Sequence, residues 1–106
     1  MSEALAEYEK LAKKLTTAEL AEAGQMFGKA CLKINGKAFV AQHKDTVVFK
    51  LSGDAHTKAM ALAGAVLWDP SGKGRPMKEW VALTSVHSKK FSSLAALASE
   101  YVQSII

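Results

Sequence analysis

The sequence predicts a single compact domain of the α+β class, in which one or two helices precede a three-stranded antiparallel meander, a helix, two strands and a closing helix. Three observations point to this class. Apolar residues recur at helical spacing near both ends of the chain, and they alternate with polar residues in the middle. An Asn-Gly pair, the strongest short signal for a β-hairpin, divides the alternating stretch. The 106 residues suffice for one domain, 1–106, with one core.

The first predicted element is an amphipathic helix over residues 2–15. Its apolar face comprises Leu5, Tyr8, Leu11, Ala12 and Leu15. Thr16 with Glu19 matches a capping box, which predicts a second short helix through about residue 23. Residues 1–24 are therefore expected to form a helical lead-in to the core of 25–106.

Alternation of period two predicts one strand over residues 25–34. The pair Asn35-Gly36 then predicts a two-residue turn, which sets Leu32 opposite Phe39 on the core face.

The third strand is expected over residues 47–51. A two-residue turn before it would set Lys50 opposite Phe39, inside the core, whereas a three-residue loop over 44–46 would set Leu51 there. Because burial of an unpaired lysine is costly, the sequence favours the longer loop.

The second half of the chain predicts a helix over about 54–63, because this stretch is rich in alanine and methionine. Strands are expected at 65–69 and 80–84, separated by the glycine- and proline-rich loop 69–76. A closing helix begins near residue 88. Its apolar stripe comprises Phe91, Leu94, Ala98, Tyr101, Val102 and Ile105.

Charge and cysteine content narrow the function classes. The net charge of +4 comes from thirteen lysines and one arginine, and readers of bases and phosphates rely on arginine, so the charge is weak support for nucleic-acid binding. The single cysteine excludes an internal disulfide and predicts a reducing, cytoplasmic location. No secretory leader is expected, and no apolar run reaches the roughly 18 residues of a membrane span.

The most distinctive candidate site is a loop comprising Gly72, Lys73, Gly74, Arg75 and Pro76. Glycines allow a backbone to approach a phosphate, and the two cations would neutralise it. A Walker A loop, however, requires Ser or Thr after its lysine and then a helix, and neither is expected here. A plain connection, or a structural pin through Arg75, remains the alternative.

A second candidate is a basic sheet face comprising Lys29, Lys33 and Lys50. Such a face suits a phosphate backbone, but only Phe27 is expected beside it for base stacking. The alternatives are a solvated or helix-covered face, and a dimer interface that includes Phe27, Cys31, Val40 and Val48. Between two of these lysines, Cys31 is either a reactive thiol or a buried small residue.

Several short motifs occur in a familiar order: Met26-Phe27-Gly28, the run from Cys31 to Phe39 containing Asn-Gly-Lys, the loop 70–77 and Trp80-Val81. Over about residues 25–105 they resemble the N-terminal domain of the TfoX/Sxy family, bacterial cytoplasmic proteins linked to transcription regulation and natural competence. The resemblance implies an α+β domain with a meander sheet. The family-motif positions, besides the loop, are Met26, Phe27, Gly28, Gly36, Lys37 and Trp80.

Full-length family members carry a second, helical C-terminal domain that has no counterpart here, so competence activation is not expected to carry over. We expect a non-enzymatic regulatory or protein-interaction module without catalytic residues, metal or cofactor, whose partner is another protein or a second copy of the chain. Two alternatives remain open: weak nucleic-acid or anion binding through the lysine face and the loop, and a small enzyme or thiol sensor using Cys31.

Overall fold

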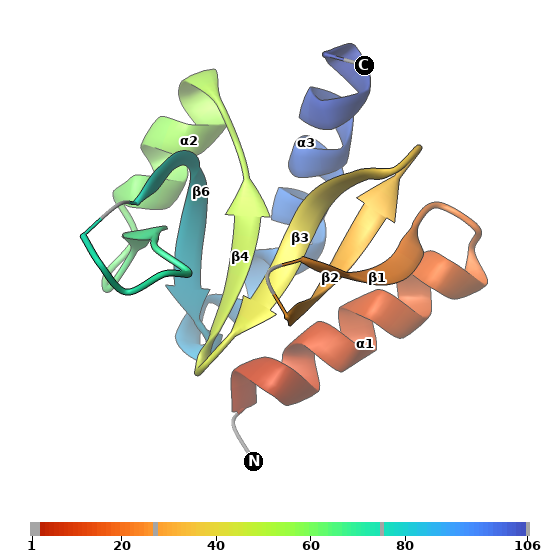
Figure 1. Ribbon diagram of the computed structural model, residues 1–106, viewed down its shortest axis with the longest axis horizontal. Helices are drawn as coiled ribbons and strands as arrows, with labels where there is room; N and C mark the ends of the chain where they lie inside the picture. Colours follow the sequence, from red (N-terminus) through yellow and green to blue (C-terminus); the bar gives the residue numbers. More distant parts are fainter. Residues whose placement is uncertain (1–2, 27, 75, 106) are drawn as a thin grey trace.

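The computed structural model describes residues 3–26, 28–74 and 76–105. Its elements are α1 (Glu3–Thr17), β1 (Glu22–Met26), β2 (Lys29–Ile34), β3 (Lys37–His43), β4 (Thr46–Lys50), α2 (Gly53–Met60), β5 (Val66–Trp68), β6 (Met77–Thr84), the 3-10 segment η1 (Ser85–Lys90) and α3 (Phe91–Ser104). The strands form one antiparallel sheet in the order β1-β2-β3-β4-β6-β5 (Figure 1). The α+β class is confirmed, with a meander of four consecutive strands instead of three.

The prediction of a second short helix after residue 16 is wrong. Thr16 Oγ1 donates back to the carbonyl of Ala12 at 2.8 Å instead of capping a new helix. Glu19 adopts a left-handed backbone with φ 59°, and its N–H donates to the Thr16 carbonyl at 3.1 Å. The N–H of Leu20 donates to the Leu15 carbonyl at 2.9 Å. This pair of bonds is a Schellman motif, which ends α1, and the chain then enters β1.

The single strand expected over 25–34 is a hairpin of β1 and β2. Met26 pairs with Lys29, so the chain reverses between them. Gly28 lies in this turn with φ 74°, a conformation that glycine adopts without steric cost. A lone glycine in an alternating stretch is also compatible with a continuous strand, and the sequence pattern therefore did not reveal the reversal.

The register between β2 and β3 differs from the expected one. The Asn35-Gly36 turn forms, with φ values of 50° and 80°. Beyond it, Leu32 pairs with Val40 and not with Phe39, because Phe39 is the extra residue of a β-bulge on β3. The bulge sends Phe39 and Val40 into the same core, which strict alternation would forbid.

The three-residue loop expected before β4 is also wrong, since β3 and β4 are joined by the two-residue turn Lys44-Asp45. Without a bulge, this turn would set Lys50 opposite Phe39 inside the core. The extra residue of the bulge shifts the pairing, so that the two side chains lie on opposite faces. Lys50 pairs with Trp80 and lies over its ring, 6.0 Å from the centroid, on the opposite side of the sheet from Phe39.

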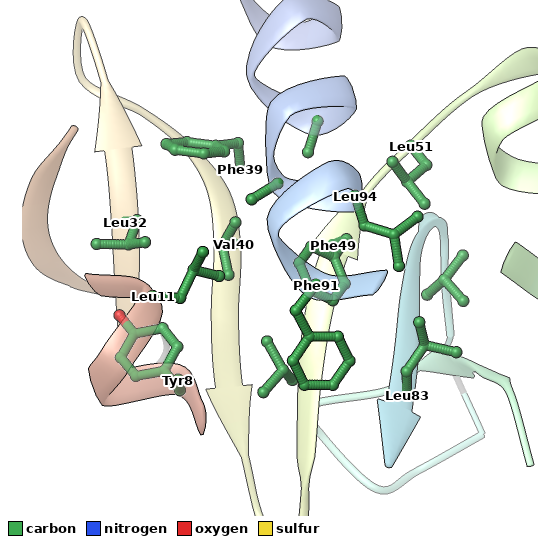
Figure 2. Packing of buried hydrophobic residues seen from close by; sticks show 14 of the residues in the cluster. Tyr8, Leu11, Leu32, Phe39, Val40, Phe49, Leu51, Leu83, Phe91 and Leu94 are labelled. Carbon is green, nitrogen blue, oxygen red and sulfur yellow. The ribbon is translucent and has the colours of Figure 1, made fainter. Parts of the chain in front are cut away.

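We call the face covered by α1 and α3 the helix side. Its core includes Ala4, Tyr8 and Leu11 of α1, and α3 adds its expected stripe except for the half-exposed Tyr101 and the exposed Ile105. The phenyl rings of Phe49 and Phe91 are 5.3 Å apart. Figure 2 shows this packing for Tyr8, Leu11, Leu32, Phe39, Val40, Phe49, Leu51, Leu83, Phe91 and Leu94.

The other face, which we call the tryptophan side, holds a smaller buried cluster. Its members all come from strands: Cys31, Ala41, Val48, Trp68, Trp80 and Ala82. The indole rings of Trp68 and Trp80 lie edge to face with centroids 5.3 Å apart. The two-residue turn with strict alternation also predicts Ala41 and Ala30 on the same face as Phe39, whereas Ala41 lies in the tryptophan-side cluster and Ala30 is exposed. Both errors follow from the missed bulge and the missed first hairpin.

Candidate functional site

A groove of about 760 Å³ opens on the helix side, between the C-terminal end of α1 and the length of α3. In Figure 1 the two helices diverge, and the tip of the β2–β3 hairpin lies between their C-terminal ends. We call this the acidic groove; it is lined by Leu15, Thr16, Glu19, Leu20, Ala21, Glu22, Lys33, Ile34, Asn35, Phe39, Ser92, Ala95, Ala96, Ser99, Glu100 and Gln103. Its volume falls in the usual range for ligand sites, roughly 300–1,000 Å³.

The lining combines an apolar floor with a polar rim. Phe39 and Ala95 belong to the helix-side core, and Leu15 and Ile34 are partly buried against it. Leu20 also lines the groove but is 60% exposed, which makes it one of the most exposed large apolar side chains described. Leu20 thereby adds apolar surface at the border of the groove.

The residues that line the groove include three glutamates, Glu19, Glu22 and Glu100, and one lysine, Lys33. Glu22 and Lys33 pair directly across β1 and β2, and the Lys33 side chain lies beside Gly24. The local net charge is thus −2 on a chain whose overall charge is +4. Within the described part of the chain, none of the three carboxylates forms a hydrogen bond or an ion pair with another residue. Glu22 lies opposite a cation on the neighbouring strand, which stabilises a sheet. Among the described residues, Glu19 and Glu100 are the acids of the groove that lack such a partner.

Glu19 occupies a position that suits neither its backbone nor its charge. A left-handed φ of 59° favours glycine, and a side chain there costs on the order of 1 kcal/mol. The residue also follows the C-terminal end of α1, where the helix dipole favours cations over carboxylates. Compared with a glycine at this position, Glu19 therefore lowers the stability of the fold through its backbone conformation and through its charge.

The candidate loop forms its own anion-binding nest and fills it with its own carboxylate. Asp69 Oδ1 accepts the N–H groups of Ser71 and Gly72, each at 3.1 Å, and the Ser71 hydroxyl at 2.7 Å. Asp69 Oδ2 accepts the N–H of Gly74 at 2.8 Å. The N–H of Lys73 donates to Ser71 Oγ at 3.2 Å. The amides that would cradle a phosphate are therefore engaged, which favours the structural role of this loop. Pro76 is exposed, and Arg75 lies outside the described residues.

The three lysines of the basic face lie around the tryptophan-side cluster. Lys50 lies over the Trp80 ring. Lys33 opposes the burial that raises the pKa of Cys31, and Lys29 adds to the burial that lowers the pKa of His43. The expected solvated sheet between them is instead a dry apolar cluster, in which Trp68 is 2% exposed and Trp80 6% exposed. Neither indole face is open for base stacking.

His43 and Trp68 form a contact that sequence reasoning missed. Trp68 Nε1 donates a hydrogen bond to His43 Nδ1 at 2.7 Å, so the imidazole must be unprotonated at Nδ1. Burial is the main reason why the pKa of His43 is lowered, and the charges of Lys29 and Lys44 lower it further. The bond ties the edge strand β5 to β3 across the tryptophan side.

Cys31 is fully buried within the tryptophan side. Burial raises the pKa of its thiol, and this effect exceeds the opposing influence of Lys33. A buried thiol with a raised pKa is mostly protonated at neutral pH, which opposes nucleophilic chemistry. The small-hydrophobe role considered for Cys31 agrees with this geometry.

The other titratable groups do not assemble into a metal or acid–base site. Over residues 3–26, 28–74 and 76–105, no group of three His, Cys, Asp or Glu side chains is arranged to hold a metal ion. Tyr101 on α3 donates a hydrogen bond to the Glu79 carboxylate on β6, and this bond is the main reason why the pKa of Tyr101 is raised. The phenol therefore stays protonated, and the pair joins α3 to β6. No helix in the described segments has the length and apolar character needed to cross a bilayer.

Four of the six family-motif positions outside the loop have a structural role in the fold. Gly28 and Gly36 have positive φ in two tight turns. Met26 and Trp80 pack on the tryptophan side, and Lys37 is exposed after the Asn-Gly turn. Phe27 lies outside the described residues.

The acidic groove itself was not foreseen from the sequence. Its walls come from segments distant along the chain, and only the packing of α1 and α3 on one face brings them together. One local signal existed, namely an acid and an exposed leucine directly after the apolar periodicity of α1 stops. The capping-box pattern of Thr16 and Glu19 instead favoured a second helix over these residues.

Comparison of the chain with protein-family models, curated proteins and solved structures finds no match in any of the three.

Proposed function

We propose that the protein is a non-enzymatic regulatory module that binds a segment of a partner protein in the acidic groove. The TfoX N-terminal-domain type remains part of this proposal, and the order and spacing of the motifs from Met26 to Trp80 support it. The observation that carries the binding role is the groove itself, an apolar floor with the exposed Leu20 at its border and with Glu19 and Glu100 among its lining residues.

The rest of the described surface supports this assignment by contrast. The carboxylate of Asp69 is engaged by its own loop, and the thiol of Cys31 is buried. The groove, in comparison, combines apolar area, charge and open volume in one place. Such a combination is typical of sites that bind a peptide segment and of sites that bind a small molecule.

Site-directed photo-crosslinking in the host cell tests the proposal. A benzophenone amino acid replaces Ala96, which is exposed and lines the groove, and in a matched control it replaces Thr57, which is exposed on α2 outside the groove. We expect a discrete protein adduct from position 96 only, with the crosslinked segment identified by mass spectrometry. Equal labelling from both positions, or no adduct from position 96, would overturn the proposal.

A second candidate function is weak anion or nucleic-acid binding by the basic face, because Lys29, Lys33 and Lys50 surround one cluster. Titration with single-stranded DNA and RNA at low salt tests it. Binding through phosphates must weaken steeply as salt rises, and it must fall in a Lys29→Ala, Lys33→Ala double variant. Affinity that ignores salt would exclude this mechanism.

A further inference from the structure

We propose that the occupant of the acidic groove is an amphipathic helix whose borders carry lysine or arginine, and that Glu19 is the residue that selects for this charge. The inference rests on the proposed function and specifies its partner. It follows from the shape of the groove, from its charge and from the position of Glu19.

The shape suits about three turns of helix. The groove follows α3 from Ser92 to Gln103, eleven residue steps or roughly 16 Å at 1.5 Å per residue. Four of the six α3 residues that line the groove are small, and the two long ones, Glu100 and Gln103, lie toward its C-terminal end. A partner backbone can approach the stretch from Ser92 to Ser99 closely. A helix laid between two diverging helices would place its apolar stripe on the floor formed by the core residues.

The charge determines which helix fits. The lining residues carry a net charge of −2, and the carboxylates of Glu19 and Glu100 have no partner among the described residues, while the chain as a whole is positive. A second copy of the chain has a suitable net charge of +4. To occupy the groove, however, it would have to offer an exposed cationic helix with an apolar stripe. The stripes of α1 and α3 are already buried in their own core. A cationic amphipathic segment of a different protein satisfies both requirements.

Glu19 is the residue of this surface whose presence local stability explains least. Its backbone favours glycine and its place at the end of α1 favours a cation, so local stability does not explain a glutamate there. Its carboxylate lines the groove beside the exposed Leu20, where a cation at the border of the occupant would neutralise it.

The test uses two synthetic peptides of about twelve residues. A hydrocarbon staple holds each peptide helical, because isolated helices of this length are marginally stable in water. Both carry leucine on one face; one has lysine and the other glutamate at the borders of that face. Titration into ¹⁵N-labelled full chain is followed by NMR. We expect the lysine peptide to shift the amides of α3 residues 92–103 and of the α1 end, and the glutamate peptide to bind at least tenfold more weakly.

Two variants separate selection by Glu19 from general electrostatics. Glu19→Gln should weaken binding of the lysine peptide by about two- to fivefold, the range of a partly exposed ion pair. Glu9→Gln, an exposed acid on α1 outside the groove, should leave it unchanged. Equal effects of the two variants would overturn the role of Glu19. Equal affinity for the two peptides, shifts confined to other surfaces, or no binding of either peptide would overturn the assignment of the occupant.

The two proposals can fail separately. If position 96 crosslinks to a protein segment that is neither helical nor cationic, the groove is an interaction site and the occupant assignment is wrong. If the lysine peptide binds but position 96 gives no adduct in the cell, the occupant chemistry stands and the proposed function is wrong.

Discussion

The two sides of the sheet bury their apolar residues by different means. On the helix side, α1 and α3 bring large side chains down onto the strands, and the core extends across the sheet. On the tryptophan side the strands supply every buried member, and two indoles cover three small residues and a valine. One side therefore depends on packing between layers, and the other depends on two large rings and the hydrogen bond from Trp68 to His43.

The loop after β5 and the groove differ in how their carboxylates are used. The loop uses the carboxylate of Asp69 to satisfy its own amides. The groove between the diverging helices includes two acids, Glu19 and Glu100, whose carboxylates have no partner among the described residues. A carboxylate with internal partners serves the fold, whereas one kept at a cost to stability is available to a ligand. Four predictions test this contrast, from the largest expected effect to the smallest.

Truncation of either core should be strongly destabilising. Trp80→Ala removes one of the two covering rings and should lower the free energy of unfolding by about 3–5 kcal/mol, and Leu32→Ala on the helix side by about 2–5 kcal/mol. Urea denaturation measures both. If Trp80→Ala costs less than about 1 kcal/mol, the tryptophan side is not a true core, and the contrast between the two sides is lost.

Removal of the carboxylate from the loop should have the next largest effect. Asp69→Ala leaves the N–H groups of Ser71, Gly72 and Gly74 to water and should cost about 1–3 kcal/mol, as is usual for hydrogen bonds to a charged group. Lys73→Ala, in the same exposed loop, is the matched control and should be neutral in urea denaturation. If Lys73→Ala costs as much as Asp69→Ala, the loop does not depend on the Asp69 nest.

Glu19→Gly should have the opposite sign. Relief of the left-handed backbone and of the unfavourable charge should raise the free energy of unfolding by about 1 kcal/mol. The same substitution at Glu9, inside α1, should lower it by about 1 kcal/mol because glycine disfavours a helix interior. Thermal and urea unfolding of both variants measure the difference. A destabilised Glu19→Gly variant would show that Glu19 is structural.

Acid should weaken the tryptophan side by the smallest amount. Because the folded chain lowers the pKa of His43, the unfolded chain takes up a proton first as the pH falls through the usual histidine value of about 6.5. The contribution of the neutral imidazole is therefore complete above that pH and is lost as the pH falls toward the lowered folded pKa. The urea midpoint from pH 8 to 5 should decline less in His43→Gln, which keeps an acceptor for Trp68. If the urea midpoints of the wild type and of His43→Gln decline equally, the titration of His43 does not contribute to the stability of the tryptophan side.

The sequence determined the class of the fold because hydrophobic periodicity is a local property. The helix at each end, the Asn35-Gly36 turn and the two strands after α2 follow from spacing and turn chemistry alone. The separation of Lys50 from Phe39 was also correct, although the loop chosen to achieve it was not. The lysines, the loop residues and the single cysteine could be named as candidates because their chemistry is visible in one dimension.

Only the tertiary structure decided the register, the second core and the groove. The bulge at Phe39 forms because both Phe39 and Val40 can be buried under α1 and α3, a gain that arises once those helices are in place. Trp68 and Trp80 meet because β6 pairs with both β4 and β5, a long-range choice that no local pattern encodes. The unpartnered acids gather at one groove for the same reason: the angle between two helices depends on how their side chains pack on the sheet, and spacing along the chain does not specify it.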